Sequence, residues 1–199
     1  MTNHIFITGL PSVGKTTLIK KVIDIIEDKY SHRFTVKGFY TQEVRSATEE
    51  RIGFDIIDIT NPLNRKQLAR IDFNSGPKVG KYFVDLHSFE SIAIPLLNIS
   101  KEEIELLDKS NKQMILVIDE IGKMETFSDV FRKSVRQMFD NEVTTKSYRI
   151  MATLPVKRNV QLAEDLRRRS GSDEIHINRS NRNSMADRVV NMLCENAIR

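Results

Sequence analysis

The residues best suited to chemistry lie near the start of the chain, in the segment GLPSVGKT at residues 9–16. This phosphate-binding loop matches the pattern G-x-x-x-x-G-K-[ST] at every fixed position. Converging backbone N–H groups in such a loop solvate several negative charges, and its glycines allow close backbone approach. We expect Lys15 to reach the β- and γ-phosphates of a nucleotide and the Thr16 hydroxyl to bind Mg²⁺. The predicted phosphate-binding residues are Gly9, Leu10, Pro11, Ser12, Val13, Gly14, Lys15, Thr16 and, nearer the α-phosphate, Thr17.

A second group of chemically suited residues follows an apolar run at residues 115–118, where Asp119 and Glu120 stand side by side. We predict a buried strand beside the strand that precedes the loop, so that Asp119 reaches the magnesium shell through water. Glu120 lies one residue further, where a carboxylate could accept a proton from an attacking water. The predicted metal ligands are therefore Thr16 and Asp119, and Lys15 and Glu120 are predicted to be catalytic. The nucleotide-binding set extends to Val117, Ile118, Asp119, Glu120, Ile121 and Gly122.

Candidates for a third component of the site lie further along the chain. Thr153 ends an apolar segment, where it could sense the γ-phosphate or simply end a strand. Arg167 or Arg169 could stabilise developing charge on the γ-phosphate as an arginine finger, and their helical spacing lets at most one point inward. Lys123 and Glu125 could belong to the site or form an exposed ion pair, and both interpretations stay open.

A guanine-specific switch is the main competing interpretation of the acidic pair, because residues 119–122 also fit D-x-x-G. A guanine reader normally adds N-K-x-D after a later strand. The nearest match, at residues 111–114, lacks the aspartate and precedes the acidic strand, so this interpretation is disfavoured. Residues 181–183 follow the last predicted strand and could border a base or cap a helix.

The elements that must position these residues alternate between short apolar runs and helix-period segments, a pattern typical of α/β proteins. Two strands joined by the polar tip 46–50 predict a hairpin, and the polar segment 60–80 predicts a long excursion. We therefore predict an α/β fold, a P-loop NTPase three-layer α/β/α sandwich. Its sheet is mainly parallel with an inserted antiparallel hairpin, in one domain over 1–199 with the insertion at about 36–86. The predicted strands are 4–8, 36–44, 51–59, 82–86, 114–118, 148–153 and 174–178, and the helices are 15–30, 88–98, 100–110, 126–140, 159–169 and 183–197.

Composition narrows the class of protein. Of 199 residues, 40% are hydrophobic and 29% are charged, which is globular rather than disordered composition. The single cysteine, Cys194, excludes a disulfide framework and a cysteine-based zinc finger. No apolar run approaches membrane-spanning length, and the first residues do not resemble a secretory signal. We therefore expect no membrane association and a cytoplasmic location, with nuclear presence left open.

The charge balance bears on the ligand. The formal net charge is +4 and the isoelectric point is near 9.2, a mild excess that suits an anionic partner. The basic residues are too dispersed to indicate a nucleic-acid surface, and the run at residues 167–169 is more typical of a solvated helix end. Nucleoside triphosphates are thus the predicted partners.

Several segments match a known family in their order and spacing: HIFITGLPSVGKTTLI, GFYTQEVR at 38–45, RIGFDIID at 51–58, VGKYFVDLHSFESIAIPLL at 79–97, VIDEIGKMETFS at 117–128 and SNRN at 180–183. Through these segments the chain resembles, over nearly its whole length, the cancer-related nucleoside-triphosphatase family. The resemblance implies hydrolysis of ATP, GTP and other nucleoside triphosphates to diphosphate and phosphate. It also implies loose base selectivity, slow turnover, dependence on Mg²⁺ and a mostly monomeric protein, and it places family arginines at Arg167 and Arg169.

The resulting hypothesis is a nucleoside-triphosphate phosphatase with magnesium as its cofactor. A nucleotide or small-molecule kinase shares the loop but needs an acceptor site and a lid, which residues 60–80 could provide. The paired carboxylates favour water as the acceptor. A second alternative is an ATP-binding switch module that acts on a macromolecular partner, for which steeply salt-sensitive nucleic-acid binding would be the sign.

Overall fold

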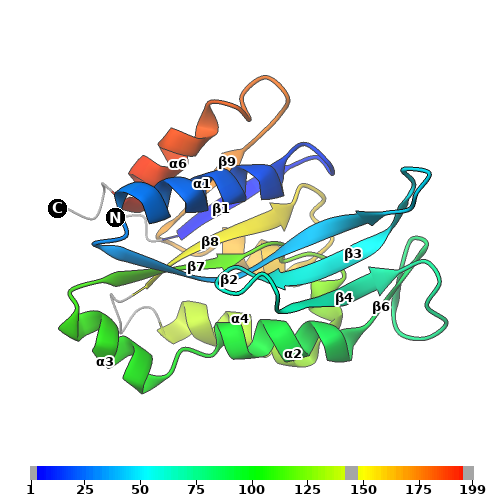
Figure 1. Cartoon of the computed structure of the whole chain (residues 1–199), viewed down its shortest axis with the longest axis horizontal. Helices are drawn as coiled ribbons and strands as arrows, with labels where there is room; N and C mark the ends of the chain where they lie inside the picture. The colour runs from blue at the N-terminus through cyan, green and yellow to red at the C-terminus, as the bar shows by residue number, and fades with distance from the viewer. Residues whose placement is uncertain (1–3, 142–147, 195–199) are drawn as a thin grey trace.

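The computed structural model describes residues 4–141 and 148–194, which form an α/β fold around a nine-stranded sheet (Figure 1). The strand order is β5-β6-β4-β3-β2-β7-β8-β1-β9. The strands of the parallel half are β1 (His4–Gly9), β2 (Phe34–Arg45), β7 (Gln113–Ile118), β8 (Tyr148–Pro155) and β9 (Ser172–His176). The antiparallel half continues through β3 (Arg51–Asp58), β4 (Arg65–Arg70), β6 (Tyr82–Val84) and β5 (Lys78–Val79). The helices are α1 (Lys15–Lys29), α2 (Leu86–Leu97), α3 (Lys101–Lys109), α4 (Asp129–Asn141), α5 (Gln161–Arg167) and α6 (Met185–Cys194), with a short 3₁₀ turn η1 (Glu125–Phe127).

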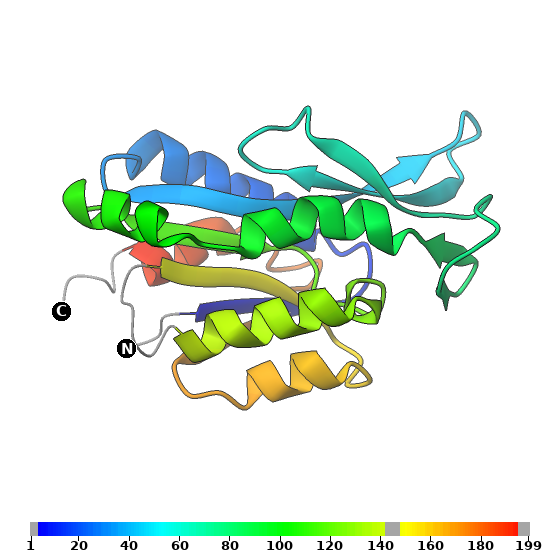
Figure 2. The same cartoon turned by 90° about the horizontal axis from the view of Figure 1, so that it is seen from below.

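Three layers follow from the alternation of side chains along the central strands. In β1, Ile5 and Ile7 lie in the apolar cluster under α1 and α6, whereas Phe6 lies in the cluster on the opposite face. Strand β7 alternates in the same way, with Val117 on the first face and Ile118 on the second. Helices α2, α3, α4 and α5 cover that second face, as Figure 2 shows. The predicted α/β/α sandwich is confirmed.

One prediction about strand order is wrong. The acidic strand β7 does not lie beside the loop strand β1, because β8 lies between them and pairs in parallel with both. In this register Gly9 is level with Pro155, and Ile118 is level with Ala152. The hydropathy of parallel strands does not indicate which strands are neighbours in the sheet, because each strand is apolar on both faces.

The predicted hairpin is present as β2 and β3, but the insertion is larger than a hairpin. The excursion at residues 60–80 contains β4 and β5, so four antiparallel strands extend the sheet beyond β2. A buried ion pair fixes this extension: Arg70 donates to the Asp55 carboxylate, which also accepts from Arg65 Nε at 2.5 Å. Strand β4 therefore rests on paired charges as well as on apolar packing.

Gly38 allows the hairpin to join the parallel half. Its φ is +130°, and a Cβ there would lie 2.0 Å from the backbone oxygen of Val117. Any other residue would push β2 away from the acidic strand. The β2–β3 hairpin is thereby held directly beside the acidic strand β7.

Candidate functional site

The phosphate-binding loop leads directly from β1 into α1. Gly14 stands at the helix N-terminus with φ +109°, and its backbone oxygen accepts from the Leu18 N–H at 2.9 Å. Lys15 Nζ turns back to donate to the Gly9 oxygen at 3.2 Å, and Arg182 Nη1 donates to the Val13 oxygen at 3.1 Å. The free N–H groups of the first turn of α1 therefore face the loop, which is the arrangement that binds anions.

Asp119 reaches the loop from β7 across 103 residues of sequence. Thr16 Oγ1 donates to Asp119 Oδ2 at 2.6 Å, and the buried Thr153 Oγ1 donates to Oδ1 at 2.6 Å. Burial raises the pKa of Asp119, while the two hydroxyls and the positive charge of Lys15 act in the opposite direction. Thr153 thus orients this carboxylate rather than pointing at a phosphate.

The donor set fits a magnesium ion. Mg²⁺ in nucleotide sites is held by one or two protein oxygens together with phosphate oxygens and waters. The Thr16 hydroxyl and the Asp119 carboxylate are such hard oxygen donors and already lie side by side. Over residues 4–141 and 148–194, no group of three or more His, Cys, Asp or Glu side chains is placed to hold a metal. The coordination positions beyond these two oxygens would therefore be filled by ligand oxygens and water.

Glu120 follows directly and faces the loop lysine. Its Oε2 lies 3.9 Å from Lys15 Nζ, and its side chain is 31% exposed. Burial raises the pKa of Glu120; the charge of Lys15 lowers it and that of Asp119 raises it further. A carboxylate with a raised pKa at a cavity wall is a better proton acceptor than an ordinary surface glutamate.

Glu125 is buried, so of the two interpretations the exposed ion pair with Lys123 is wrong. The turn η1 directs its Oε2 to accept the Gly122 N–H at 3.1 Å. Burial and the charges of Glu120 and Asp119 raise its pKa to about 8. Near neutral pH this side chain is therefore largely a neutral acid in the structure.

The raised pKa of Glu125 predicts a stability that falls as pH rises. Between its ordinary value of 4.5 and about 8, the folded protein holds a proton that the unfolded chain has lost. The free energy of unfolding should therefore decrease with pH across this window, by at most about 1.4 kcal/mol per pH unit, and level off above it. Urea unfolding of nucleotide-free Glu125→Gln should show a shallower decline, because only the raised pKa values of Asp119 and Glu120 remain, whereas the exposed-site control Glu105→Gln should keep the full decline. Parallel pH profiles of wild type and Glu125→Gln would contradict the assignment.

Several predicted site residues are not brought to the loop. Arg167 is 6% exposed, donates to the Pro155 oxygen at 2.5 Å and to Glu174 at 3.1 Å, and also pairs with Glu164. Arg169 donates to Asp140 at 2.6 Å. Both arginines are therefore paired with carboxylates of α4, α5 and β9, and their placement gives no support to a catalytic role.

Three hydrophobic members of the acidic segment have structural positions. Val117, Ile118 and Ile121 are each 0% exposed, so their side chains cannot touch a ligand. The first two fix the end of β7, and the Ile121 N–H donates to the Thr153 oxygen at 2.9 Å. They position the acids instead of contacting a nucleotide.

A cavity of about 530 Å³ opens over the loop, a volume typical of small-molecule sites. One wall is the loop with Glu120, and the other is the β2–β3 hairpin, whose contribution sequence reasoning missed. The sequence predicts these two strands as a hairpin, but their composition carries no signal of a ligand. The lining residues are Pro11, Ser12, Gly14, Lys15, Thr16, Thr17, Lys20, Thr41, Gln42, Glu43, Arg45, Arg51, Phe54 and Glu120.

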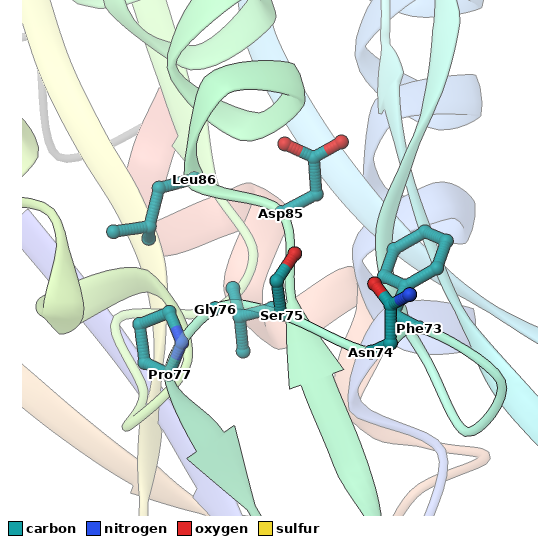
Figure 3. A pocket seen from close by; sticks show the side chains of 8 residues that line it. Phe73, Asn74, Ser75, Gly76, Pro77, Asp85 and Leu86 are labelled. Atoms are coloured by element: carbon teal, nitrogen blue, oxygen red, sulfur yellow. The ribbon is translucent and has the colours of Figure 1, made fainter.

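A second cavity, of about 410 Å³, lies between the loop before β5 and the start of α2 (Figure 3). Asp85 is the charged side chain in its lining, and this carboxylate caps α2 by accepting from the Ser88 N–H at 3.0 Å. With an acid and no cation in its lining, this cavity does not suit a polyphosphate.

Comparisons with known proteins agree with this geometry. A family model described as NTPase matches residues 4–190. The chain is 38% identical to the mouse cancer-related nucleoside-triphosphatase homolog, with 96% of each chain covered. It is 37% identical to nucleoside-triphosphatase THEP1 of Aquifex aeolicus, covering 95% of this chain and 98% of that protein.

Two solved structures are also similar. The crystal structure of Aquifex aeolicus THEP1 aligns with a TM-score of 0.75 and 34% identity, covering 96% of this chain and 99% of that one. The solution structure of a human cancer-related nucleoside triphosphatase aligns with a TM-score of 0.76 and 35% identity, covering 97% of this chain and 98% of that one.

In the described part of the present chain, every helix is too short or too polar to cross a membrane.

Proposed function

Because the chain belongs to the nucleoside-triphosphatase family, whose members it matches over nearly its full length, we propose that it is a magnesium-dependent phosphatase of nucleoside triphosphates. Its substrates would include ATP, GTP and other triphosphates, with loose base selectivity. The observation that carries the proposal is the contact between Thr16 and Asp119, which joins the loop to the acidic pair.

Different residues of the site have different roles in hydrolysis. Backbone N–H groups of the loop and Lys15 bind the phosphates. Thr16 and Asp119 would hold Mg²⁺, which when bound supplies positive charge to the β- and γ-phosphate oxygens. Glu120 orients a water whose oxygen forms a bond to the γ-phosphorus as the bond from that phosphorus to the β–γ bridging oxygen breaks. The proton of the water passes to Glu120, and the products are a nucleoside diphosphate and phosphate.

The kinase alternative loses its candidate lid. Residues 65–70 and 78–79 are strands paired within the sheet, so the excursion is not a free flap over the loop. A carboxylate such as Glu120 can take the proton of water or of an alcohol, so the two functions are separated by assay. Phosphate release without any acceptor separates the two functions, and multiple turnover without a partner separates the enzyme from a switch module.

The direct test is a panel of ATP, GTP, CTP and UTP incubated with the purified protein, with Mg²⁺ and with excess EDTA. We expect catalytic release of phosphate from several of the four in the presence of Mg²⁺. Release should fall to the uncatalysed level with EDTA and return when Mg²⁺ is restored. Phosphate release that requires an added acceptor or protein partner would contradict the proposal.

A further inference from the structure

One wall of the nucleotide cavity has no role in the hydrolysis proposed for this site. This wall is the β2–β3 hairpin, and it contributes Arg45 and Arg51, the two arginines in the described lining of the cavity. Both lie within or beside the segments GFYTQEVR and RIGFDIID. Phosphoryl transfer commonly employs an arginine against the charge that develops on the γ-phosphate, and Arg167 and Arg169 are held elsewhere.

The hairpin lies on the same side of the loop as Glu120, the side on which the proposed mechanism puts the γ-phosphate. Strand β2 pairs in parallel with the acidic strand β7, with Phe39 level with Ile118. The hairpin is therefore on the same side of β1 as Glu120, whereas β9 pairs on the other side of β1. In Figure 1 the tip of the hairpin and the loop after β1 lie at the same end of the molecule.

A short chain of contacts joins Arg51 to the loop. Arg51 Nη1 donates to Glu43 Oε1 at 2.8 Å, and the same oxygen accepts from the Ser12 hydroxyl at 3.3 Å. The Glu43 carboxylate therefore bridges the Arg51 guanidinium and the Ser12 hydroxyl of the phosphate-binding loop. An anionic phosphate at the loop would compete with Glu43 for the same cation.

Arg51 is held more firmly than Arg45. Its Nε donates to the Tyr82 hydroxyl at 3.0 Å, and its guanidinium lies 5.4 Å from the centre of the Phe54 ring. Arg45 also donates to Glu43, from Nη2 to Oε2 at 2.8 Å, but its other side-chain contact is to the Glu49 oxygen at the hairpin tip, and its side chain is 49% exposed against 37% for Arg51. The contacts with Tyr82 and Phe54 can hold the Arg51 side chain while its Nη1 changes acceptor, so less entropy is lost than for Arg45, and Arg51 is the better candidate.

We propose that Arg51 is a catalytic residue, an arginine finger supplied by the chain's own hairpin, which turns from Glu43 to the γ-phosphate oxygens as the bond to the leaving diphosphate breaks. This inference rests on the proposed phosphatase function and adds the group that stabilises its transition state. Bonds form and break as in the hydrolysis described above, and the guanidinium keeps all its protons.

The test compares Arg51→Ala with wild type in phosphate release and in binding of ADP with and without aluminium fluoride, both with Mg²⁺. We expect kcat to fall by roughly 10²–10³, at or somewhat below the lower end of what arginine fingers supply. ADP affinity should change less than about threefold, while the tightening caused by aluminium fluoride, which mimics the transferring phosphoryl group, should be lost. The control Lys66→Ala removes an exposed cation of β4 and should behave like wild type in every assay.

A purely structural role for Arg51 gives a different pattern. Turnover within about threefold of wild type, or a retained aluminium fluoride complex in a slow variant, would overturn the proposal. If Arg51→Ala does not fold, as judged by its circular dichroism melting curve, Arg51→Lys keeps the charge but not the planar fork. We then expect at least a tenfold loss of kcat, and wild-type kcat in folded Arg51→Lys would overturn the proposal. Wild-type protein that releases no phosphate would instead refute the phosphatase function itself.

Discussion

Glu120→Gln is expected to lower kcat for triphosphate hydrolysis by a factor of about 10²–10⁴, the range for loss of a general base. The substitution keeps the size of the side chain and removes its ability to take the proton of the attacking water. Nucleotide affinity should stay within about threefold, because the phosphates are bound by the loop and Lys15 rather than by this carboxylate. Phosphate release under saturating substrate and Mg²⁺, together with titration calorimetry, measures the two effects separately.

The matched control for Glu120→Gln is Glu105→Gln, which removes an exposed carboxylate on α3 far from the loop in the fold. It should hydrolyse triphosphates as wild type does. Unchanged turnover in Glu120→Gln would show that another group activates the water. Loss of nucleotide binding in the same variant would show that Glu120 helps to hold the ligand.

Lys15→Ala is expected to weaken triphosphate binding by about 10–10², the value of a charge-assisted contact to a phosphate. Because the same contact strengthens as charge develops on the γ-phosphate, kcat/KM should fall by roughly 10³ or more. Lys15 Nζ also donates to the Gly9 oxygen, so the alanine variant loses an internal support of the loop. Calorimetric titration with a non-hydrolysable triphosphate and steady-state kinetics report the two losses.

The control for Lys15→Ala is Lys21→Ala, which removes the same charge from an exposed position on the same helix. Its affinity and kcat/KM should match those of wild type. If the two variants bind the triphosphate equally well, the attraction comes from the general positive charge of the protein rather than from a fixed contact.

Much of the fold could be predicted because its signals are local. The loop pattern fixed the junction of β1 and α1, and the compact run before Asp119 predicted β7 to within one residue. Strand β4 was missed because RKQLAR reads as a charged segment. Its strand character depends on the Asp55 carboxylate that neutralises Arg65 and Arg70, and this pairing is visible only in three dimensions.

The chemistry of the site was less accessible from the sequence. Asp119 and Thr16 could be paired because their motifs have known partners, but Thr153 gained its role from the insertion of β8 between β1 and β7. The sequence left Glu125 open between a site residue and an exposed ion pair, because its burial depends on the turn η1 rather than on a hydropathy pattern. Arg45 and Arg51, which line the cavity, come from the hairpin. Their place in the site could not be predicted, because neighbours across a sheet leave no trace in sequence spacing.

The strand order also governs when this protein can become active during its synthesis. Of the described strands β1 leaves the ribosome first, yet both of its partners, β8 and β9, lie at residues 148–155 and 172–176. The nascent phosphate-binding loop therefore lacks one flanking strand until more than three-quarters of the 199 residues have been translated, and the other until more than four-fifths. Such long-range pairing slows folding, and it leaves an apolar strand uncovered in the meantime. A growing chain of this protein should accordingly acquire nucleotide affinity late in its synthesis.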